Sequence, residues 1–320
     1  MSCDVSVVIC CYTLDRWRDL VAAIDSVLAQ EQEPGSAPTE LVVVVDHNPD
    51  LLDRLRDARP ELTVVGNAAT RGLSGARNTG LKLVASEVVA FLDDDARARP
   101  GWLAAHAAAY DDPRVLGVGG RLEPTWDTGR PGWFPHDFDW VVGCSHTGVP
   151  VSPAEIRNPI GANMSFRTDV LREAGGFSED LGRVGTRPLG CEETEASIRV
   201  GQRRPGGVIW YVPDAVVDHR VTAERARWSY YRRRCWAEGW SKSTVRRLSQ
   251  ESLGAERDYA TRILPRSFAT AVRRGVTGDR DSLARAGAIA GGLGLTAMGY
   301  AAGHLSNRSG RLHRALEEKA

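Results

Sequence analysis

The residues with the clearest chemical potential are three adjacent carboxylates, Asp93, Asp94 and Asp95, which directly follow an apolar, β-branched run. Adjacent carboxylates repel one another unless a positive group binds them. Hard divalent cations prefer such oxygen ligands, and Mg²⁺ or Mn²⁺ commonly bridges carboxylates and substrate phosphates. The triplet therefore predicts a metal site that faces a phosphorylated ligand. A solvated turn or a helix cap is the structural alternative.

Two further polar residues follow apolar runs. Asp46 follows residues 41–45, and its carboxylate could accept hydrogen bonds from a nucleoside base or a ribose hydroxyl. Its structural alternative is to cap the helix that follows. His219 ends an extended segment, where a neutral imidazole could complete a metal site, although a lone histidine is more often structural.

Carboxylates also gather at a predicted helix start, in the segment Gly190-Cys-Glu-Glu-Thr-Glu195. A carboxylate there could act as a general base toward an acceptor hydroxyl, and a helix cap is the alternative because the helix dipole favours acids at this end. A glycine-rich turn, Arg71-Gly-Leu-Ser-Gly-Ala-Arg-Asn-Thr-Gly80, enters another helix. Helix N-termini and arginine suit phosphate, but tight packing explains the glycines equally well.

Alternating strands and helices must position these residues. The patterns predict buried strands over residues 5–9, 41–45, 62–65, 88–92, 163–166 and 208–212, and helices over 19–30, 51–59, 74–84, 100–110 and 192–202. Such alternation predicts an α/β fold with a mostly parallel sheet and helices on both faces. Ligands bind beyond the carboxyl ends of such strands. Tyr12, Asp46 and the acidic triplet are therefore expected to converge on one site.

The later part of the chain changes character. Residues 124–148 are rich in tryptophan, phenylalanine, glycine and proline, which predicts a loop or an irregular hairpin over the site, with Trp133 and Trp140 in an acceptor wall. From about residue 223 the chain becomes basic and helical, so we divide it into domains 1–222 and 223–320. Residues 286–303 are uncharged and rich in small residues, which favours a packed helix over a membrane contact or span. The basic C-terminal helices leave peripheral membrane contact open.

Composition narrows the functional classes. Lys+Arg and Asp+Glu both number 41, so the chain lacks the overall positive field expected of a nucleic-acid-binding protein. None of the six cysteines has CxxC spacing, which argues against a structural zinc site. Reduced thiols and the absence of a signal-peptide pattern predict a cytoplasmic protein, while the oligomeric state is left open.

Taken in order, these motifs resemble the family 2 glycosyltransferases, which have the GT-A fold (Rossmann-like). The resemblance covers roughly residues 4–222. It is carried by the segments Val5-Ser-Val-Val-Ile-Cys-Cys-Tyr12, Ser74-Gly-Ala-Arg-Asn-Thr-Gly80, Phe91-Leu-Asp-Asp-Asp95, Gly161-Ala-Asn-Met-Ser-Phe166, Gly175-Gly-Phe177 and Cys191-Glu-Glu-Thr-Glu195. It implies an inverting transfer of a sugar from a nucleotide-diphosphate donor, UDP-sugar favoured, in a bacterial polysaccharide or glycolipid pathway.

The resemblance also implies roles for single residues. Asp93 and Asp95, assisted by His219, would hold Mg²⁺ or Mn²⁺ on the donor diphosphate. Glu193 would be the catalytic base, with Glu192 as its neighbour. The residues implied in donor binding are Cys10, Tyr12, Asp46, Arg77, Asn78, Asp93, Asp94 and Asn163.

One departure from the family pattern bears on the identity of the donor. Asp46-His47-Asn48-Pro49 replaces the usual Asp-Asp-Gly-Ser, which puts the donor base in question. The variant resembles a bacterial and archaeal subgroup labelled glucosyl-dolichyl-phosphate glucuronosyltransferases, for which Arg183 and Arg187 could bind a sugar carboxylate. The acceptor class stays open among carbohydrate, lipid-linked and small-molecule acceptors. A sugar-phosphate nucleotidyltransferase and a catalytically silent sugar-binding protein are the rival functions.

Overall fold

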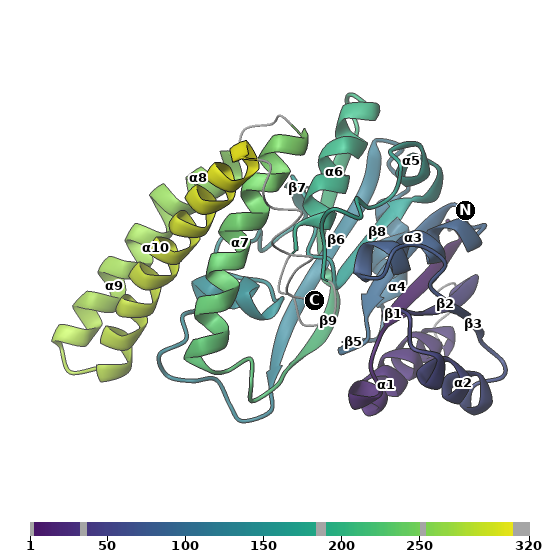
Figure 1. Cartoon of the computed structure of the whole chain (residues 1–320), viewed down its shortest axis with the longest axis horizontal. Coiled ribbons are helices and arrows are strands. Elements are labelled where there is room, and N and C mark those ends of the chain that lie inside the picture. The colour runs from purple at the N-terminus through teal and green to yellow at the C-terminus, as the bar shows by residue number, and fades with distance from the viewer. Residues whose placement is uncertain (1–2, 33–36, 184–189, 250–253, 310–320) are drawn as a thin grey trace.

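The computed structural model describes residues 3–32, 37–183, 190–249 and 254–309. Within these residues nine strands form one sheet with helices on both faces, and further helices pack at one end (Figure 1). The strand order is β3-β2-β1-β4-β8-β6-β9-β5, and β7 pairs with β9 beside this path. The predicted α/β class is confirmed.

Four parallel strands make up the first half of the sheet: β1 (Val5–Cys11), β2 (Glu40–Val45), β3 (Thr63–Gly66) and β4 (Val88–Asp93). Their apolar runs suit strands that are covered on both faces. The helices between them are α1 (Trp17–Leu28), α2 (Pro49–Ala58) and α3 (Leu73–Leu83), with 3₁₀ turns η1 (Leu14–Arg16) and η2 (Ala29–Gln32) around α1. Cys10 pairs with Asp93 and Cys11 with Val45, so β1, β2 and β4 end at one edge.

The second half of the sheet mixes strand directions. Its strands are β5 (Ala96–Ala98), β6 (Val115–Trp126), β7 (Ala154–Ile156), β8 (Asn163–Arg167) and β9 (Val208–Val221). β8 runs antiparallel to β4 and β6, whereas the long strands β6 and β9 are parallel. The sequence patterns do not predict β6, and they place its last residues, 124–126, in the loop or irregular hairpin expected over 124–148. Gly117 and Gly120 weaken its strand signal, because Phe166 and Asn163 occupy the space that a Cβ would need.

Apolar cores form on the two faces of the sheet. The remaining helices of this part are α4 (Trp102–Ala109), the 3₁₀ segment η3 (His136–Val142), α5 (Thr168–Glu173) and α6 (Glu192–Arg203). Phe91, Phe166 and Phe177 anchor one core, and Trp102 and Tyr231 belong to the other. Each such buried side chain stabilises the fold by about 1.5–3 kcal/mol, so the strand ends rest on a rigid base.

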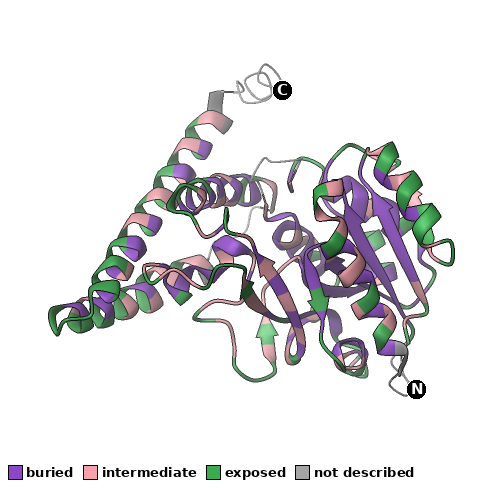
Figure 2. Cartoon of the chain, turned by 90° about the horizontal axis from the view of Figure 1, so that it is seen from below, coloured by how far each residue is buried: buried purple, intermediate pink, exposed green. Residues whose placement is uncertain are grey.

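The C-terminal part is helical: α7 (Trp228–Ser249), α8 (Gly254–Asp258), the π-helical turn η4 (Tyr259–Ile263), α9 (Leu264–Val276) and α10 (Arg280–Ser309). α10 lies along α7, and a Cβ at Gly239 or Gly299 would overlap backbone atoms of the partner helix. The small residues of 286–303 thus serve helix packing. None of the described helices is long and apolar enough to cross a membrane. Figure 2 shows buried strands and a mixture of buried and exposed positions along these helices.

Candidate active site

The acidic triplet sits at the end of β4, where each carboxylate meets an arginine. Arg77 lies 3.2 Å from Asp93, Arg16 lies 2.7 Å from Asp94, and Arg225 lies 2.8 Å from Asp95. Asp94 and Asp95 are buried, while Asp93 is about a quarter exposed and lines a cavity. The repulsion expected among the three carboxylates is therefore relieved by three guanidinium groups.

The two buried carboxylates differ in their protonation. Burial raises the pKa of Asp94 to about 7, against the opposing effect of Arg16. Burial would also raise the pKa of Asp95, but Arg225 and His219 hold it well below its usual value. Asp95 is therefore a carboxylate at neutral pH, whereas Asp94 holds a proton for part of the time.

A metal-ligand set exists at this strand end. One ligand atom each from Asp93, Asp95 and His219 lies within 4.8 Å of the others. The His219 Nε2 atom is 3.3 Å from Asp95 Oδ1, and its Nδ1 atom is 3.8 Å from the Cys144 sulfur. Two carboxylates and an imidazole suit a divalent cation, and the nitrogen ligand favours Mn²⁺ over Mg²⁺. The residues fit the predicted ion.

Asp46, at the end of β2, is tied into the protein. It accepts hydrogen bonds from the Asn67 side chain at 2.7 Å and from the Gly72 N–H at 2.9 Å, and the His47 ring lies 3.0 Å away. The N-cap of α2 is Asn48, so the capping alternative for Asp46 is wrong. Asp46 instead links β2 to the turn before α3.

Arg77 joins three elements beneath the cavity. Its buried guanidinium contacts Glu192 at 2.7 Å, Asp93 at 3.2 Å and the Gly161 carbonyl at 2.9 Å. α3 places it there because Gly80, on the same helix, allows close packing on Val8. The phosphate-binding arginine expected from sequence is thus located between the metal-ligand set and the carboxylates of α6.

The other implied donor contacts lie in different surroundings. The Asn78 amide exchanges two hydrogen bonds with the Phe177 backbone. The buried Asn163 amide accepts from Trp102 and donates to the carbonyls of Arg121 and Ala215. Both amides hold the protein together, which leaves them little capacity for a ligand.

Cys10 and Tyr12 lie near the end of β1. Burial raises the pKa of Cys10 to about 12, so its thiol is neutral. The half-buried Tyr12 ring lies 5.6 Å from the Arg16 guanidinium and remains accessible. Of the two, Tyr12 is the better placed to meet a ligand.

Glu192 and Glu193 begin α6 and face the same cavity as Asp93. Glu192 pairs with Arg77, and its other oxygen has no hydrogen-bond partner among the described residues. The Thr194 hydroxyl donates to Glu193 at 3.1 Å. Burial, and then the neighbouring Glu192, raises the pKa of Glu193 to about 7, a value suited to a general base at neutral pH.

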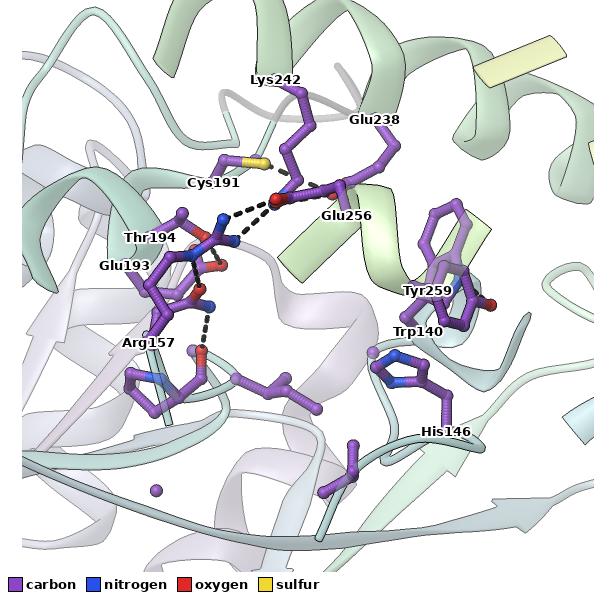
Figure 3. A pocket seen from close by; sticks show the side chains of 18 of the residues that line it. Trp140, His146, Arg157, Cys191, Glu193, Thr194, Glu238, Lys242, Glu256 and Tyr259 are labelled. Carbon is purple, nitrogen blue, oxygen red and sulfur yellow. Dashed lines mark hydrogen bonds and ion pairs between the residues drawn. The ribbon is translucent and has the colours of Figure 1, made fainter. Parts of the chain in front are cut away.

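The cavity extends from these groups to the C-terminal helices. Its volume is about 810 Å³. Figure 3 shows an ionic network along one wall: Glu256 binds Arg157 at 2.5 and 2.6 Å and Lys242 at 3.0 Å. Lys242 also lies 3.5 Å from Glu238, which accepts from the Cys191 thiol at 3.4 Å. The C-terminal helices thus build part of the site.

An aromatic wall stands across the cavity from this network. Trp140, Tyr259 and His146 lie together in Figure 3, and the Trp140 ring donates to the Tyr259 hydroxyl at 3.2 Å. Trp140 lines the cavity as predicted, but Trp133 is not among the described lining residues and packs on Trp228 and Tyr231 instead.

Sequence reasoning missed several charged residues of the site. Arg16 and Arg225 neutralise the triplet, and Lys242 and Glu256 build the ionic network. Apart from Glu238, four residues from Lys242, the partners that define these roles are 14 to 130 residues away in the chain, so no short motif marks them. Arg183 lines the cavity, whereas Arg187 lies outside the described residues.

A family model and a curated relative show the family of this chain. The family model described as Glycosyl transferase family 2 matches residues 6–175. A glucosyl-dolichyl phosphate glucuronosyltransferase of Haloferax volcanii is 36% identical over 245 residues, which are 75% of this chain and 77% of that protein.

Two solved structures share the fold. The mannosyltransferase PcManGT from Pyrobaculum calidifontis, in complex with GDP-Man and Mn²⁺, has a TM-score of 0.57 at 19% identity, covering 94% of this chain and 87% of that one. GalNAc-T7 with UDP, GalNAc and Mn²⁺ has a TM-score of 0.51 at 16% identity, covering 81% of this chain and 54% of that one. The present chain spans about half the length of the second structure.

Proposed function

We propose a reaction for this chain, which belongs to glycosyl transferase family 2 and is a glycosyltransferase. It moves a sugar from a nucleotide-diphosphate donor to an acceptor hydroxyl with inversion at the anomeric carbon. Family membership decides against the nucleotidyltransferase and the silent binding protein. The proposal takes a UDP-sugar as donor and a lipid-linked glycan as acceptor.

One observation carries the proposal: a metal-ligand set and a carboxylate with a pKa near neutrality face the same cavity. Asp93, Asp95 and His219 form the set, and Glu193 lies on the same lining surface. Arg77 lies between the two groups. This arrangement gives a diphosphate and an acceptor hydroxyl separate places within one cavity.

At the donor end, Asp93, Asp95 and His219 would hold Mn²⁺ or Mg²⁺, which supplies positive charge to offset that of the leaving diphosphate. Arg77 adds a fixed cation close to the same place. Tyr12 lies at the adjoining strand end, where a nucleoside would pack. The family resemblance favours uracil as the base.

At the acceptor end, Glu193 takes the proton of the acceptor hydroxyl as its oxygen attacks the anomeric carbon. The bond from that carbon to the diphosphate oxygen breaks on the opposite side, and the nucleoside diphosphate leaves with the electron pair. A single displacement of this kind inverts the configuration. Thr194 holds the Glu193 carboxylate in place by its hydrogen bond.

A lipid-linked acceptor is supported by the lining of the cavity. Ile160, Ile263 and Leu293 contribute apolar surface, and Trp140 and Tyr259 contribute aromatic surface. Aromatic faces pack on sugars, and apolar side chains accommodate hydrocarbon. The name of the Haloferax relative points to the same acceptor class.

A screen of UDP- and GDP-sugars tests this function, with release of nucleoside diphosphate as the readout and with Mn²⁺, Mg²⁺ or a chelator present. We expect release from one UDP-sugar, with Mn²⁺ the more effective ion. NMR of the anomeric proton in the product then reports inversion. Turnover that is unchanged by chelation would contradict the metal assignment, and retained configuration would contradict the single displacement.

A further inference from the structure

Exposed apolar side chains are concentrated on the C-terminal helices. In the described part of the chain, eight of the ten large apolar residues that are exposed lie in α7, α9 and α10. These eight are Trp228, Trp236, Phe268, Val276, Leu283, Leu293, Met298 and Leu305. Leu293 lines the cavity and Trp228 packs on Trp133, so the residues that are left to meet a partner are mainly those of α9 and its connection to α10.

The connection between α9 and α10 is the most apolar part of this surface. Val276 is 78% exposed and Leu283 is 50% exposed on either side of it. Phe268, Val272 and Val276 recur at four-residue spacing, which places them along one side of α9. Figure 1 shows this connection at the end of the helical group farthest from the sheet. We call residues 268–283 the hairpin tip.

The helices that carry and flank the hairpin tip are basic. Residues 259–306 contain six arginines and two aspartates, a net charge of +4, whereas the whole chain has a formal charge of zero. Arg262, Arg266 and Arg273 are exposed, and their spacing places them together beside the apolar stripe of α9. An apolar stripe with an arginine flank is typical of helices that lie in a membrane interface.

We propose that the hairpin tip docks the protein on the surface of an anionic lipid bilayer, with Phe268 and Val276 in the interface and the flanking arginines at the headgroups. The positive charge matches anionic lipid, whereas two copies of this surface would repel each other. Docking is peripheral, since none of the described helices can span the bilayer. This inference goes beyond the proposed transfer reaction and does not depend on it.

The docked position has a consequence for the cavity. Ile263 and Leu264, just before the tip, and Leu293, Thr296 and Tyr300 of α10 line the cavity wall. The helices that contact the bilayer are therefore the helices that bound the acceptor end. If the acceptor is lipid-linked, as proposed above, its hydrocarbon part would remain close to the membrane.

Cosedimentation of the full chain with vesicles tests the docking surface. We expect binding to vesicles of equimolar phosphatidylcholine and phosphatidylglycerol, and little binding to pure phosphatidylcholine. The double variant Phe268→Ser/Val276→Ser should weaken binding at least tenfold, since both apolar side chains leave the interface. Arg266→Gln and Arg273→Gln should each weaken it about fivefold, with a reduced sensitivity to salt.

Matched controls remove an exposed apolar or basic side chain elsewhere. Leu83→Ser and Arg114→Gln should leave vesicle binding unchanged, and thermal unfolding verifies that all variants fold. Equal binding to neutral vesicles, or tip variants that bind like the parent, would overturn the proposal. So would a dimer in solution that the Val276→Ser change dissociates. Donor turnover without vesicles tests the transfer reaction separately, so either proposal can fail alone.

Discussion

The two ends of the cavity are built in different ways. At the proposed donor end, the candidate metal ligands come from strand ends that are fixed by the core, and every carboxylate of the triplet has a buried or half-buried arginine beside it. At the proposed acceptor end, the wall consists of a loop, the start of α6 and the C-terminal helices, and its Arg157–Glu256 pair is about a quarter exposed.

This difference suggests that the two ends of the cavity have different roles. A site on rigid strand ends keeps the charged groups in place before the donor arrives, which is what catalysis by fixed charges requires. The Arg157–Glu256 pair joins segments 99 residues apart, from the end of β7, which lies beside the main strand order, to α8. We therefore expect the donor end to carry the chemistry that members of the family share, and the acceptor end to determine which acceptor this protein binds.

The two largest effects are expected at Asp95 and Glu193. Asp95→Asn should lower sugar transfer by about 10²–10³-fold, because it removes a carboxylate that belongs to the metal-ligand set and also balances Arg225. Transfer rates with and without Mn²⁺, together with Mn²⁺ binding by calorimetry, measure the loss.

Asp94→Asn is the matched control for this change. Asp94 does not belong to the metal-ligand set, and its raised pKa already leaves it partly neutral. Its substitution should therefore preserve Mn²⁺ binding. If both variants lose Mn²⁺ binding equally, Asp94 and Asp95 do not have the separate roles that we propose.

At the acceptor end, Glu193→Gln should lower kcat by about 10²–10³-fold while donor binding stays intact, since a general base contributes an effect of this size. Because the pKa of Glu193 is about 7, the parent should gain activity as pH rises through 7 and level off above it. This rise should be absent from the residual activity of the variant. A Glu193→Gln variant with an unchanged pH profile would show that Glu193 is not the catalytic base.

A smaller effect is expected from the ionic network. Glu256→Gln should raise the acceptor KM about tenfold, because it weakens hydrogen bonds between charged groups that hold α8 to Arg157 and Lys242. The donor KM should not change. Glu224→Gln, which removes an exposed pair with Arg233, is the control and should match the parent. A higher donor KM for Glu256→Gln would mean that the two ends are not independent.

At the proposed donor end, the sequence predicts the strand ends and the residues of the metal-ligand set but not Arg16 and Arg225. At the proposed acceptor end, it predicts Glu192, Glu193 and Trp140 but not the ionic network. Apolar runs predict β1, β2 and β4 to within two residues. Because these strands are parallel, Asp46 and Asp93 lie at one edge of the sheet, and this placement does not depend on the conformation of the loops. β6 is not predicted, because glycine weakens the strand signal at positions where side chains of other segments occupy the space that a Cβ would need. Arg225 and Glu256 escaped because their roles depend on how distant helices pack, which short patterns do not encode.

The smallest predicted effect concerns the helices that form the acceptor wall. A Cβ at Gly294 of α10 would meet no atom within 4 Å among the described residues, so Gly294→Ala should stabilise the protein by about 0.5–1 kcal/mol through helix propensity alone. Gly299→Ala, five residues away, should destabilise it, because the new Cβ would overlap the Trp236 backbone. Denaturant unfolding of both variants measures the contrast. Equal stabilisation by both would mean that α7 and α10 are not packed closely in solution, and the acceptor wall would then have to form only when a ligand or a membrane brings the two helices together.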